Sequence, residues 1–114
     1  MLKNKLKIAI AGIGTVGSGL LDLLKKYKDQ NIQVSAIASR KHTKLKGKYF
    51  KNTTFFKDAK YLLDFNDYDV LVELIGGDSG IAKLIVIDAL NKKKNVVTAN
   101  KALVSRYWND FQKL

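Results

Sequence analysis

The 114-residue sequence contains no cysteine, no proline and a single histidine. Without cysteine the chain can form neither a disulfide framework nor a thiolate metal site, and His42 alone cannot supply a histidine cluster. We therefore expect no metal site and a reducing, cytoplasmic compartment. No segment reaches the roughly 18 consecutive apolar residues that a membrane-spanning helix needs, so a membrane partner is not expected.

Arginine is scarce although the chain is strongly basic. The net charge of +11 makes nucleic acid an obvious candidate partner. Of the 21 basic residues, however, only Arg40 and Arg106 are arginine. Base-edge contacts and bidentate phosphate contacts favour the planar guanidinium group, so a basic nucleic-acid-binding protein is the less favoured alternative.

The length suits one domain with a hydrophobic core, but it is small for a complete two-substrate enzyme. Hydrophobic residues make up 46% of the sequence. We find no linker, internal repeat or low-complexity segment. Residues 1–114 are therefore expected to form a single domain, or part of a larger protein.

Segments with the period of a strand and of a helix alternate along the chain, which is typical of an α/β fold. The predicted strands span residues 6–11, 33–38, 53–56, 70–75 and 95–98, and the predicted helices span 16–27, 59–65, 81–91 and 101–114. Either Asp78 or Ser79 is expected to cap the third helix. The buried stripe of that helix is predicted to comprise Ala82, Ile85, Val86 and Ala89. Right-handed crossovers then predict a doubly wound, Rossmann-like parallel sheet with strand order 3-2-1-4-5 and helices on both faces.

Gly12, Gly14 and Gly17 follow the first predicted strand with the G-x-G-x-x-G spacing of dinucleotide-binding proteins. The first glycine permits a tight turn, the second lets the backbone approach a pyrophosphate, and the third lets the helix pack closely on the strand. The N-terminus of the helix then binds phosphate through its free N–H groups and its dipole. The alternative is a glycine-rich turn that serves packing alone.

A second pair of glycines, Gly76 and Gly77, ends the predicted strand over residues 70–75. In the predicted strand order a crevice opens between the carboxyl ends of the first and fourth strands. The two glycine clusters therefore face each other, and the second leaves room for a flat nicotinamide ring. An ordinary strand-ending turn explains Gly76 and Gly77 equally well.

The end of the second predicted strand indicates which dinucleotide the site prefers. A site that prefers NAD usually has an Asp or Glu about 20 residues beyond the glycines, where it binds the ribose 2′-hydroxyl. This sequence has Ser39 there, followed by Arg40 and Lys41. A hydroxyl donor with two cations favours a 2′-phosphate and hence NADP(H) over NAD(H). The alternative is that Arg40 and Lys41 belong to a solvated loop.

Three blocks of this sequence resemble homoserine dehydrogenases. They are GIGTVGSG at residues 12–19, VELIGG at 72–77 and VVTANKALVS at 96–105, and they occur in the family's order and spacing. Members of that family are oxidoreductases of threonine and methionine biosynthesis, which reduce aspartate 4-semialdehyde to homoserine with NAD(P)H. The resemblance implies that residues 1–114 are the NAD(P)-binding Rossmann domain of such an enzyme.

The resemblance also implies roles for single residues. Ile13, Thr15 and Val16 would lie in the phosphate-binding turn, and Thr98 and Asn100 would border the nicotinamide. Lys101 would be catalytic, because an ammonium group stabilises the negative charge that hydride transfer leaves on an aldehyde oxygen. The expected cofactor-binding residues are Gly12, Ile13, Gly14, Thr15, Val16, Gly17, Ser39, Arg40, Lys41, Gly76, Gly77, Thr98, Asn100 and Lys101.

Two side chains have a simpler alternative explanation. The chain has 19 lysines, and Lys101 could be one more solvated lysine. Glu73 lies inside a buried strand and is expected to be a structural carboxylate with satisfied hydrogen bonds, not a catalytic base.

The sequence departs from the family in two ways. No proline follows Gly76 and Gly77, which removes only a preorganised helix start. Family members also continue into a segment that binds the semialdehyde and forms dimers. We therefore expect this chain alone to bind NADP(H) without turnover, and a separate chain or missing domain to supply the substrate site and dimer interface. Trp108 and Phe111 either pack on the sheet or contact that partner.

A stand-alone nucleotide-binding module without catalytic activity is the main alternative. Such a module would keep the glycine turn but would need neither Lys101 nor the Gly76–Gly77 pair.

Overall fold

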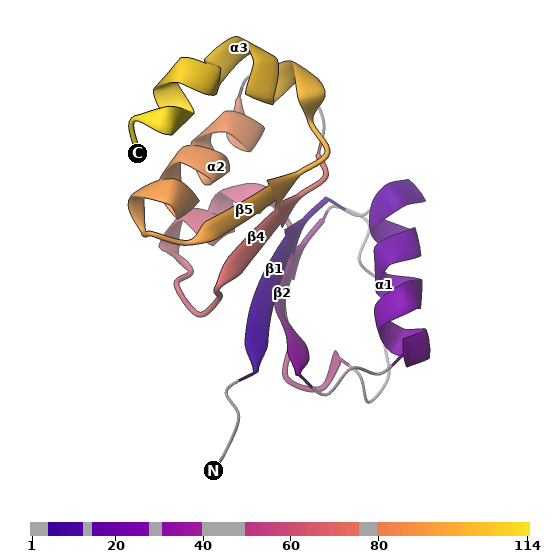
Figure 1. The fold of residues 1–114 in the computed structure, drawn as a ribbon. Coiled ribbons are helices and arrows are strands. Elements are labelled where there is room, and N and C mark those ends of the chain that lie inside the picture. The colour runs from indigo at the N-terminus through magenta and orange to yellow at the C-terminus, as the bar shows by residue number, and fades with distance from the viewer. Residues whose placement is uncertain (1–4, 13–14, 28–30, 40–49, 76–79) are drawn as a thin grey trace.

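The structure, a computed structural model, describes residues 5–12, 15–27, 31–39, 50–75 and 80–114 (Figure 1). The elements follow in the order β1 (Leu6–Ala11), α1 (Thr15–Tyr27), β2 (Ile32–Ala38), β3 (Thr54–Phe56), the 3-10 helix η2 (Ala59–Asp64), β4 (Val70–Glu73), α2 (Ile81–Asn91), β5 (Asn95–Thr98) and α3 (Lys101–Gln112). All neighbouring strands pair in parallel, in the order β3-β2-β1-β4-β5. The predicted Rossmann-like fold and strand order are therefore confirmed.

The predicted boundaries differ from the observed ones by at most two residues. Strand β4 ends at Glu73, two residues earlier than predicted: the Leu74 N–H still donates to the Ala11 carbonyl of β1, at 2.8 Å, but the Ile75 N–H donates to the Glu73 carboxylate, at 2.7 Å. The predicted cap of α2 is wrong. The residue before the helix is Gly80, with φ 69° and ψ −139° and no side-chain cap, and its carbonyl accepts from the Leu84 N–H. Asp78 and Ser79 lie outside the described residues.

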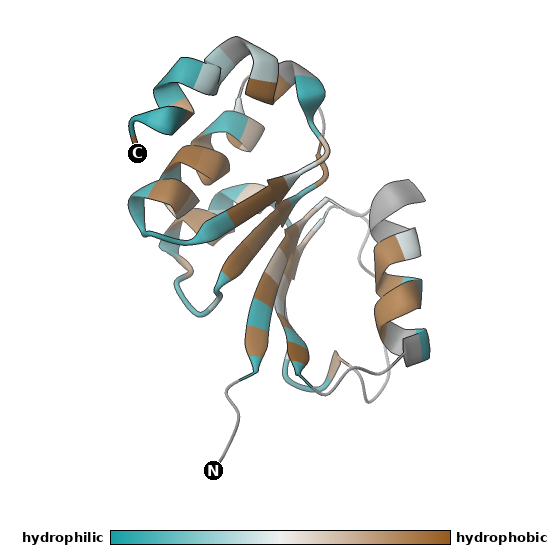
Figure 2. Cartoon of the chain, in the orientation of Figure 1, coloured by the Kyte–Doolittle hydropathy of each residue, from teal (hydrophilic) through white to brown (hydrophobic). Residues whose placement is uncertain are grey.

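Helices cover both faces of the sheet. Helix α1 lies on one face, and α2 and α3 lie on the other side (Figure 1). Along β1 the side chains alternate, so that Ile8 and Ile10 pack in the cluster that contains Leu21 of α1, whereas Ala9 and Ala11 pack in the cluster of α2. Figure 2 shows the strands and the inner sides of the helices as mostly hydrophobic. The central strands are thus buried on both faces, as their nearly continuous apolar sequence requires.

Strand β2 contains an irregularity at Ser35. The register with β1 shifts by one residue between Ile8, which pairs with Val34, and Ala9, which pairs with Ala36. The Ser35 hydroxyl is buried there and donates to the Ile8 carbonyl at 3.2 Å. This bulge places Val34 and Ile37, three residues apart, on the same face.

Helices α2 and α3 pack on each other beside β5. The predicted α2 stripe is confirmed, since Ala82, Ile85, Val86 and Ala89 are all buried. In α3, Leu103 is fully buried, and Tyr107, at which the helix is kinked, and Phe111 pack against the same cluster. Trp108 remains 53% exposed. Phe111 therefore belongs to the edge of the core, whereas Trp108 lies on the surface.

Candidate functional site

The five strands end together at one edge of the sheet. Phe56, Ala38, Ala11, Glu73 and Thr98 are the last residues of their strands, and each pairs in register with its neighbour. The residues that follow continue the backbone ladder, for example from the Gly12 N–H to the Ala38 carbonyl at 2.8 Å. Ligands of open α/β sheets bind outside this carboxyl edge, so the candidate site lies here.

Gly12 lies where β1 and β4 reach this edge. Its φ of +98° is one that only glycine adopts at low cost, which agrees with the predicted tight turn. A Cβ on Gly12 would also come within 3.0 Å of the Leu74 carbonyl carbon and 3.1 Å of the Ile75 nitrogen. Gly12 is therefore required for the close approach of the first and fourth strands, which the sequence alone does not reveal.

Helix α1 begins at Thr15, four residues after the end of β1. Its first turn contains no acidic residue. No carboxylate of this turn therefore competes with a ligand for the first N–H groups or for the positive end of the helix dipole. This N-terminus suits an anionic group such as a pyrophosphate. Thr15, Val16 and Gly17 all belong to this turn, which begins one residue before the predicted start at Val16, whereas Ile13 and Gly14 lie outside the described residues.

Ser39 directly follows β2 at the same edge. Its N–H donates to the Phe56 carbonyl at 3.0 Å, and only 8% of the residue is exposed. The position is therefore held by the ladder between β2 and β3. Arg40 and Lys41, the predicted cationic partners of Ser39, lie outside the described residues, as do Gly76 and Gly77.

A buried carboxylate connects the ends of β4 and β5. Glu73 is completely buried, and its Oε2 accepts from the Ile75 N–H at 2.7 Å, while its Oε1 accepts from the Thr98 hydroxyl at 2.6 Å. The Thr98 oxygen in turn accepts from the Asn100 N–H at 2.9 Å. Glu73 is thus a structural carboxylate with satisfied hydrogen bonds, as expected from the sequence.

Asn100 caps helix α3. Its Oδ1 accepts from the Leu103 N–H at 3.0 Å, and the side chain is buried. Lys101 follows as the first helical residue and is exposed. A cation at a helix N-terminus is disfavoured by about 0.3–1 kcal/mol, so helix stability does not explain a lysine at this position.

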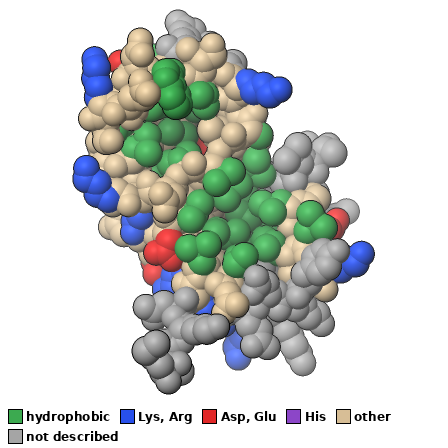
Figure 3. Space-filling view, viewed as in Figure 1, with side chains coloured by type: hydrophobic (Ala, Val, Ile, Leu, Met, Phe, Trp, Pro, Cys, Tyr) green, Lys and Arg blue, Asp and Glu red, His purple; other side chains and the backbone are tan. Residues whose placement is uncertain are grey.

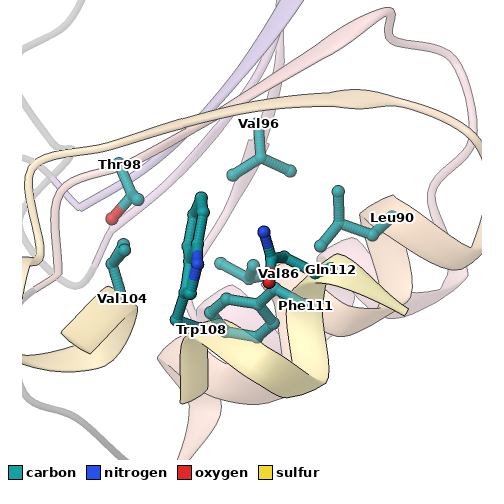
Figure 4. Close-up of a pocket in the computed structure, with 8 residues that line it drawn as sticks. All are labelled: Val86, Leu90, Val96, Thr98, Val104, Trp108, Phe111 and Gln112. Carbon is teal, nitrogen blue, oxygen red and sulfur yellow. The ribbon is translucent and has the colours of Figure 1, made fainter. Parts of the chain in front are cut away.

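An apolar groove lies on the α2 and α3 side of β5 (Figure 4). It has a volume of about 260 Å³, and its lining residues are Val86, Leu90, Val96, Thr98, Val104, Trp108, Phe111 and Gln112. Thr98 is the residue that this groove shares with the network at the carboxyl edge. The groove is therefore a separate apolar hollow beside the candidate site.

Charged side chains do not gather into one patch on the face seen in Figure 3. Hydrophobic side chains occupy its middle, between α1 and the layer of α2 and α3, and the described Lys side chains lie around its outline. A nucleic-acid groove would need these cations along one surface. This face does not offer that arrangement among the described residues.

The described ranges contain neither a cluster of metal ligands nor a membrane-spanning helix. No three His, Cys, Asp or Glu side chains group there as metal ligands would. No helix in that part of the chain is long and apolar enough to cross a lipid bilayer.

Sequence reasoning missed the links between the predicted site residues. The sequence predicts that Thr98 and Asn100 lie at the site, but it does not show that they join Glu73 to the N-terminus of α3. An asparagine directly before a predicted helix is a recognisable cap signal. The contact between Glu73 and Thr98 could have been found by aligning the two strands in parallel, because both residues are the last of theirs.

Comparison with known proteins agrees with this geometry. The family model "Homoserine dehydrogenase, NAD binding domain" matches residues 12–114. The homoserine dehydrogenase of Neisseria gonorrhoeae is 36% identical over 110 residues, which cover 90% of this chain and 25% of that protein. The chain thus spans about a quarter of the length of this curated relative.

Solved structures give the same result. The crystal structure of Staphylococcus aureus homoserine dehydrogenase at pH 7.0 matches 98% of this chain and 30% of that one, with a TM-score of 0.79 and 28% identity. A hyperthermophilic archaeal homoserine dehydrogenase mutant in complex with NADPH shares the fold, with a TM-score of 0.71 and 21% identity over 96% of this chain and 40% of that one. The chain therefore belongs to the homoserine dehydrogenase family, in which it corresponds to the NAD-binding domain.

Proposed function

We propose that this chain is the cofactor-binding part of an enzyme that transfers hydride between NAD(P)(H) and the homoserine/aspartate 4-semialdehyde pair. The observation that carries the proposal is the carboxyl edge of the sheet, where Gly12 lies against the Leu74–Ile75 backbone and helix α1 begins four residues after β1. This edge offers a phosphate-binding helix N-terminus beside a crevice between the first and fourth strands.

Different residues at this edge would bind different parts of the cofactor. The turn over residues 12–17 would hold the pyrophosphate, and Ser39, Arg40 and Lys41 would hold a 2′-phosphate. Gly76, Gly77, Thr98 and Asn100 would border the nicotinamide. The absence of a carboxylate from residues 36–41 supports a preference for NADP(H) over NAD(H), because no acidic side chain is present there to accept from a 2′-hydroxyl or to repel a phosphate.

Lys101 is the candidate catalytic residue. When bound, the nicotinamide supplies the hydride, and the Lys101 ammonium would stabilise the charge that forms on the aldehyde oxygen or give it a proton. Its exposed position at the start of α3 leaves its side chain accessible to a substrate.

Turnover would need more than these residues. The chain spans about a quarter of the curated relative's length, so we propose that a further domain or a separate chain supplies the substrate site and a dimer interface. The enzyme would be cytoplasmic. A stand-alone nucleotide-binding module is the second candidate function, because the glycine turn and α1 alone suffice for phosphate binding.

Calorimetric titration of the purified chain with NADPH, and separately with NADH, tests the cofactor proposal. We expect saturable binding that is tighter for NADPH, and Arg40→Ala should weaken NADPH binding while leaving NADH binding unchanged. Equal affinities for both cofactors would contradict the proposed 2′-phosphate site. A homoserine oxidation assay with the same preparation should detect no turnover, and appreciable turnover would contradict the need for a further segment.

Lys101→Ala separates the enzyme from the stand-alone module. Added to a preparation that contains the missing segment, this variant should lose turnover. Its unfolding free energy should stay the same or rise by about 0.3–1 kcal/mol, because it removes a cation from the N-terminus of α3. Lys113→Ala, at the opposite end of the same helix, is the matched control and should retain turnover. Full turnover without Lys101 would contradict its catalytic role, and the absence of turnover even with Lys101 present would favour the module.

A further inference from the structure

Two hydrogen bonds at the carboxyl edge lead from Asn100 through Thr98 to Glu73, and in both the donor lies on the side away from Glu73. The Asn100 N–H donates to the Thr98 hydroxyl oxygen, which leaves the hydroxyl hydrogen to be donated to Glu73 Oε1. The Ile75 N–H donates to Oε2. Both carboxylate oxygens therefore act as acceptors, and the orientation of the Thr98 hydroxyl depends on this side chain.

Burial at this position is difficult to explain by stability alone. Glu73 is 0% exposed, and it shares a row with the small residues Ala11 and Thr98 on the face that α2 covers. A buried carboxylate is costly to desolvate, and well-packed apolar residues in place of buried charges are often as stable or more stable. The network it forms therefore points to a role beyond packing.

The network ends at the residue proposed to be catalytic. From Thr98 it passes to the Asn100 backbone, and the Asn100 side chain then caps α3 through the Leu103 N–H. Lys101 lies between these two hydrogen-bonded residues, as the first residue of the helix. The junction between β5 and α3 is thus held from both sides of Lys101, and Glu73 anchors it to β4.

We propose that Glu73 is a positioning residue of the cofactor site: by holding the Thr98 hydroxyl it fixes the junction between β5 and α3 and thereby the place of Lys101. This inference rests on the proposed function, because Lys101 matters only if the edge binds a dinucleotide and its substrate. Through Ile75, the same carboxylate also holds the backbone immediately before Gly76 and Gly77.

The first test needs no cofactor. Amide hydrogen exchange of Asn100 and Leu103 is measured in the full chain and in the variants Glu73→Gln, Thr98→Val and Thr98→Ser. Glu73→Gln and Thr98→Val should each lower the protection of the Asn100 amide about tenfold relative to a core amide, whereas Thr98→Ser retains the hydroxyl and should retain the protection. Unchanged protection in Glu73→Gln and Thr98→Val would overturn the proposal.

The second test is a double-mutant cycle on NADPH affinity. Glu73→Gln should raise the Kd about tenfold in the parent chain and by less than about twofold in a Thr98→Val background, because its effect acts through the Thr98 hydroxyl. The same Kd increase in both backgrounds would overturn the proposal. Ser35→Ala is the matched control, since it removes another buried hydroxyl hydrogen bond, far along the sheet, and should leave the Kd unchanged.

The two tests keep this inference apart from the proposed function. If the parent chain does not bind NADPH, the cofactor proposal fails, and the exchange measurement still decides whether Glu73 holds the junction. If the chain binds NADPH and exchange is unchanged in Glu73→Gln, the cofactor proposal stands and the positioning role is wrong.

Discussion

Substitution of Gly12 by alanine tests the close approach of the first and fourth strands. At φ +98°, an alanine costs on the order of 1–3 kcal/mol in backbone strain. Its methyl group would meet the Leu74 carbonyl carbon at 3.0 Å, and such overpacking against backbone costs about 1–3 kcal/mol more. We therefore expect Gly12→Ala to lower the free energy of unfolding by about 2–6 kcal/mol.

Two other glycines separate these contributions. Gly80 also has a positive φ, of +69°, but beyond its chain neighbours no atom of the described residues lies within 4 Å of a Cβ there. Gly80→Ala should therefore cost only the strain of about 1–3 kcal/mol. Gly19 lies in α1, and outside the backbone of its own helix no atom of the described residues lies within 4 Å of a Cβ there. Gly19→Ala should therefore stabilise the chain by about 0.5–1 kcal/mol. Urea denaturation followed by circular dichroism measures all three. The reasoning is refuted if Gly12→Ala costs no more than Gly80→Ala.

Three further predictions concern stability. Lys93 directly follows Lys92, the C-cap residue of α2, and has φ 62°. Lys93→Gly should therefore raise the free energy of unfolding by about 0.5–1 kcal/mol in urea denaturation, and a decrease would contradict this. Burial, and to a smaller extent the Asp88 carboxylate, raises the pKa of Tyr68 from 10.0 to about 12. The tyrosine hydroxyl therefore ionises at a lower pH in the unfolded chain than in the folded one, so the free energy of unfolding should fall between pH 10 and 12. Tyr68→Phe should make that decline smaller, which unfolding measured at each pH checks. Leu103→Ala should lower the free energy of unfolding by about 2–5 kcal/mol and Trp108→Ala by less than about 1 kcal/mol, because Leu103 is fully buried and Trp108 is exposed. Thermal or urea unfolding measures both, and equal losses would contradict the assignment of Leu103 to the core and Trp108 to the surface.

Much of the fold follows from local patterns in the sequence. The nearly continuous apolar residues of β4 and the four-residue helical stripe of α2 predict their elements, because burial on one or both faces leaves a period in the sequence. The bulge at Ser35 could not be predicted, because it depends on the register with β1. The position of Gly80 directly before α2 was also not predicted, because the sequence favours a residue with a capping side chain, such as Asp78 or Ser79, over a glycine.

The candidate site was predictable in its positions but less so in its contacts. The G-x-G-x-x-G spacing placed Gly12 at the end of β1, where a positive φ is observed. The approach of Leu74 to Gly12, and the bond from Thr98 to Glu73, join segments about 25 to 60 residues apart, and only the assembled sheet brings them together. Residue types and spacing therefore located the edge, whereas its internal hydrogen bonds required the structure.

The central claim is that a dinucleotide binds at the carboxyl edge between β1 and β4. Backbone amide chemical shifts of the isotope-labelled chain, recorded during titration with NADPH, test it most directly. We predict that the largest changes fall on Gly12, Thr15, Ser39, Ile75 and Thr98. Changes confined to the groove around Trp108, or no saturable change at any amide, would contradict the account.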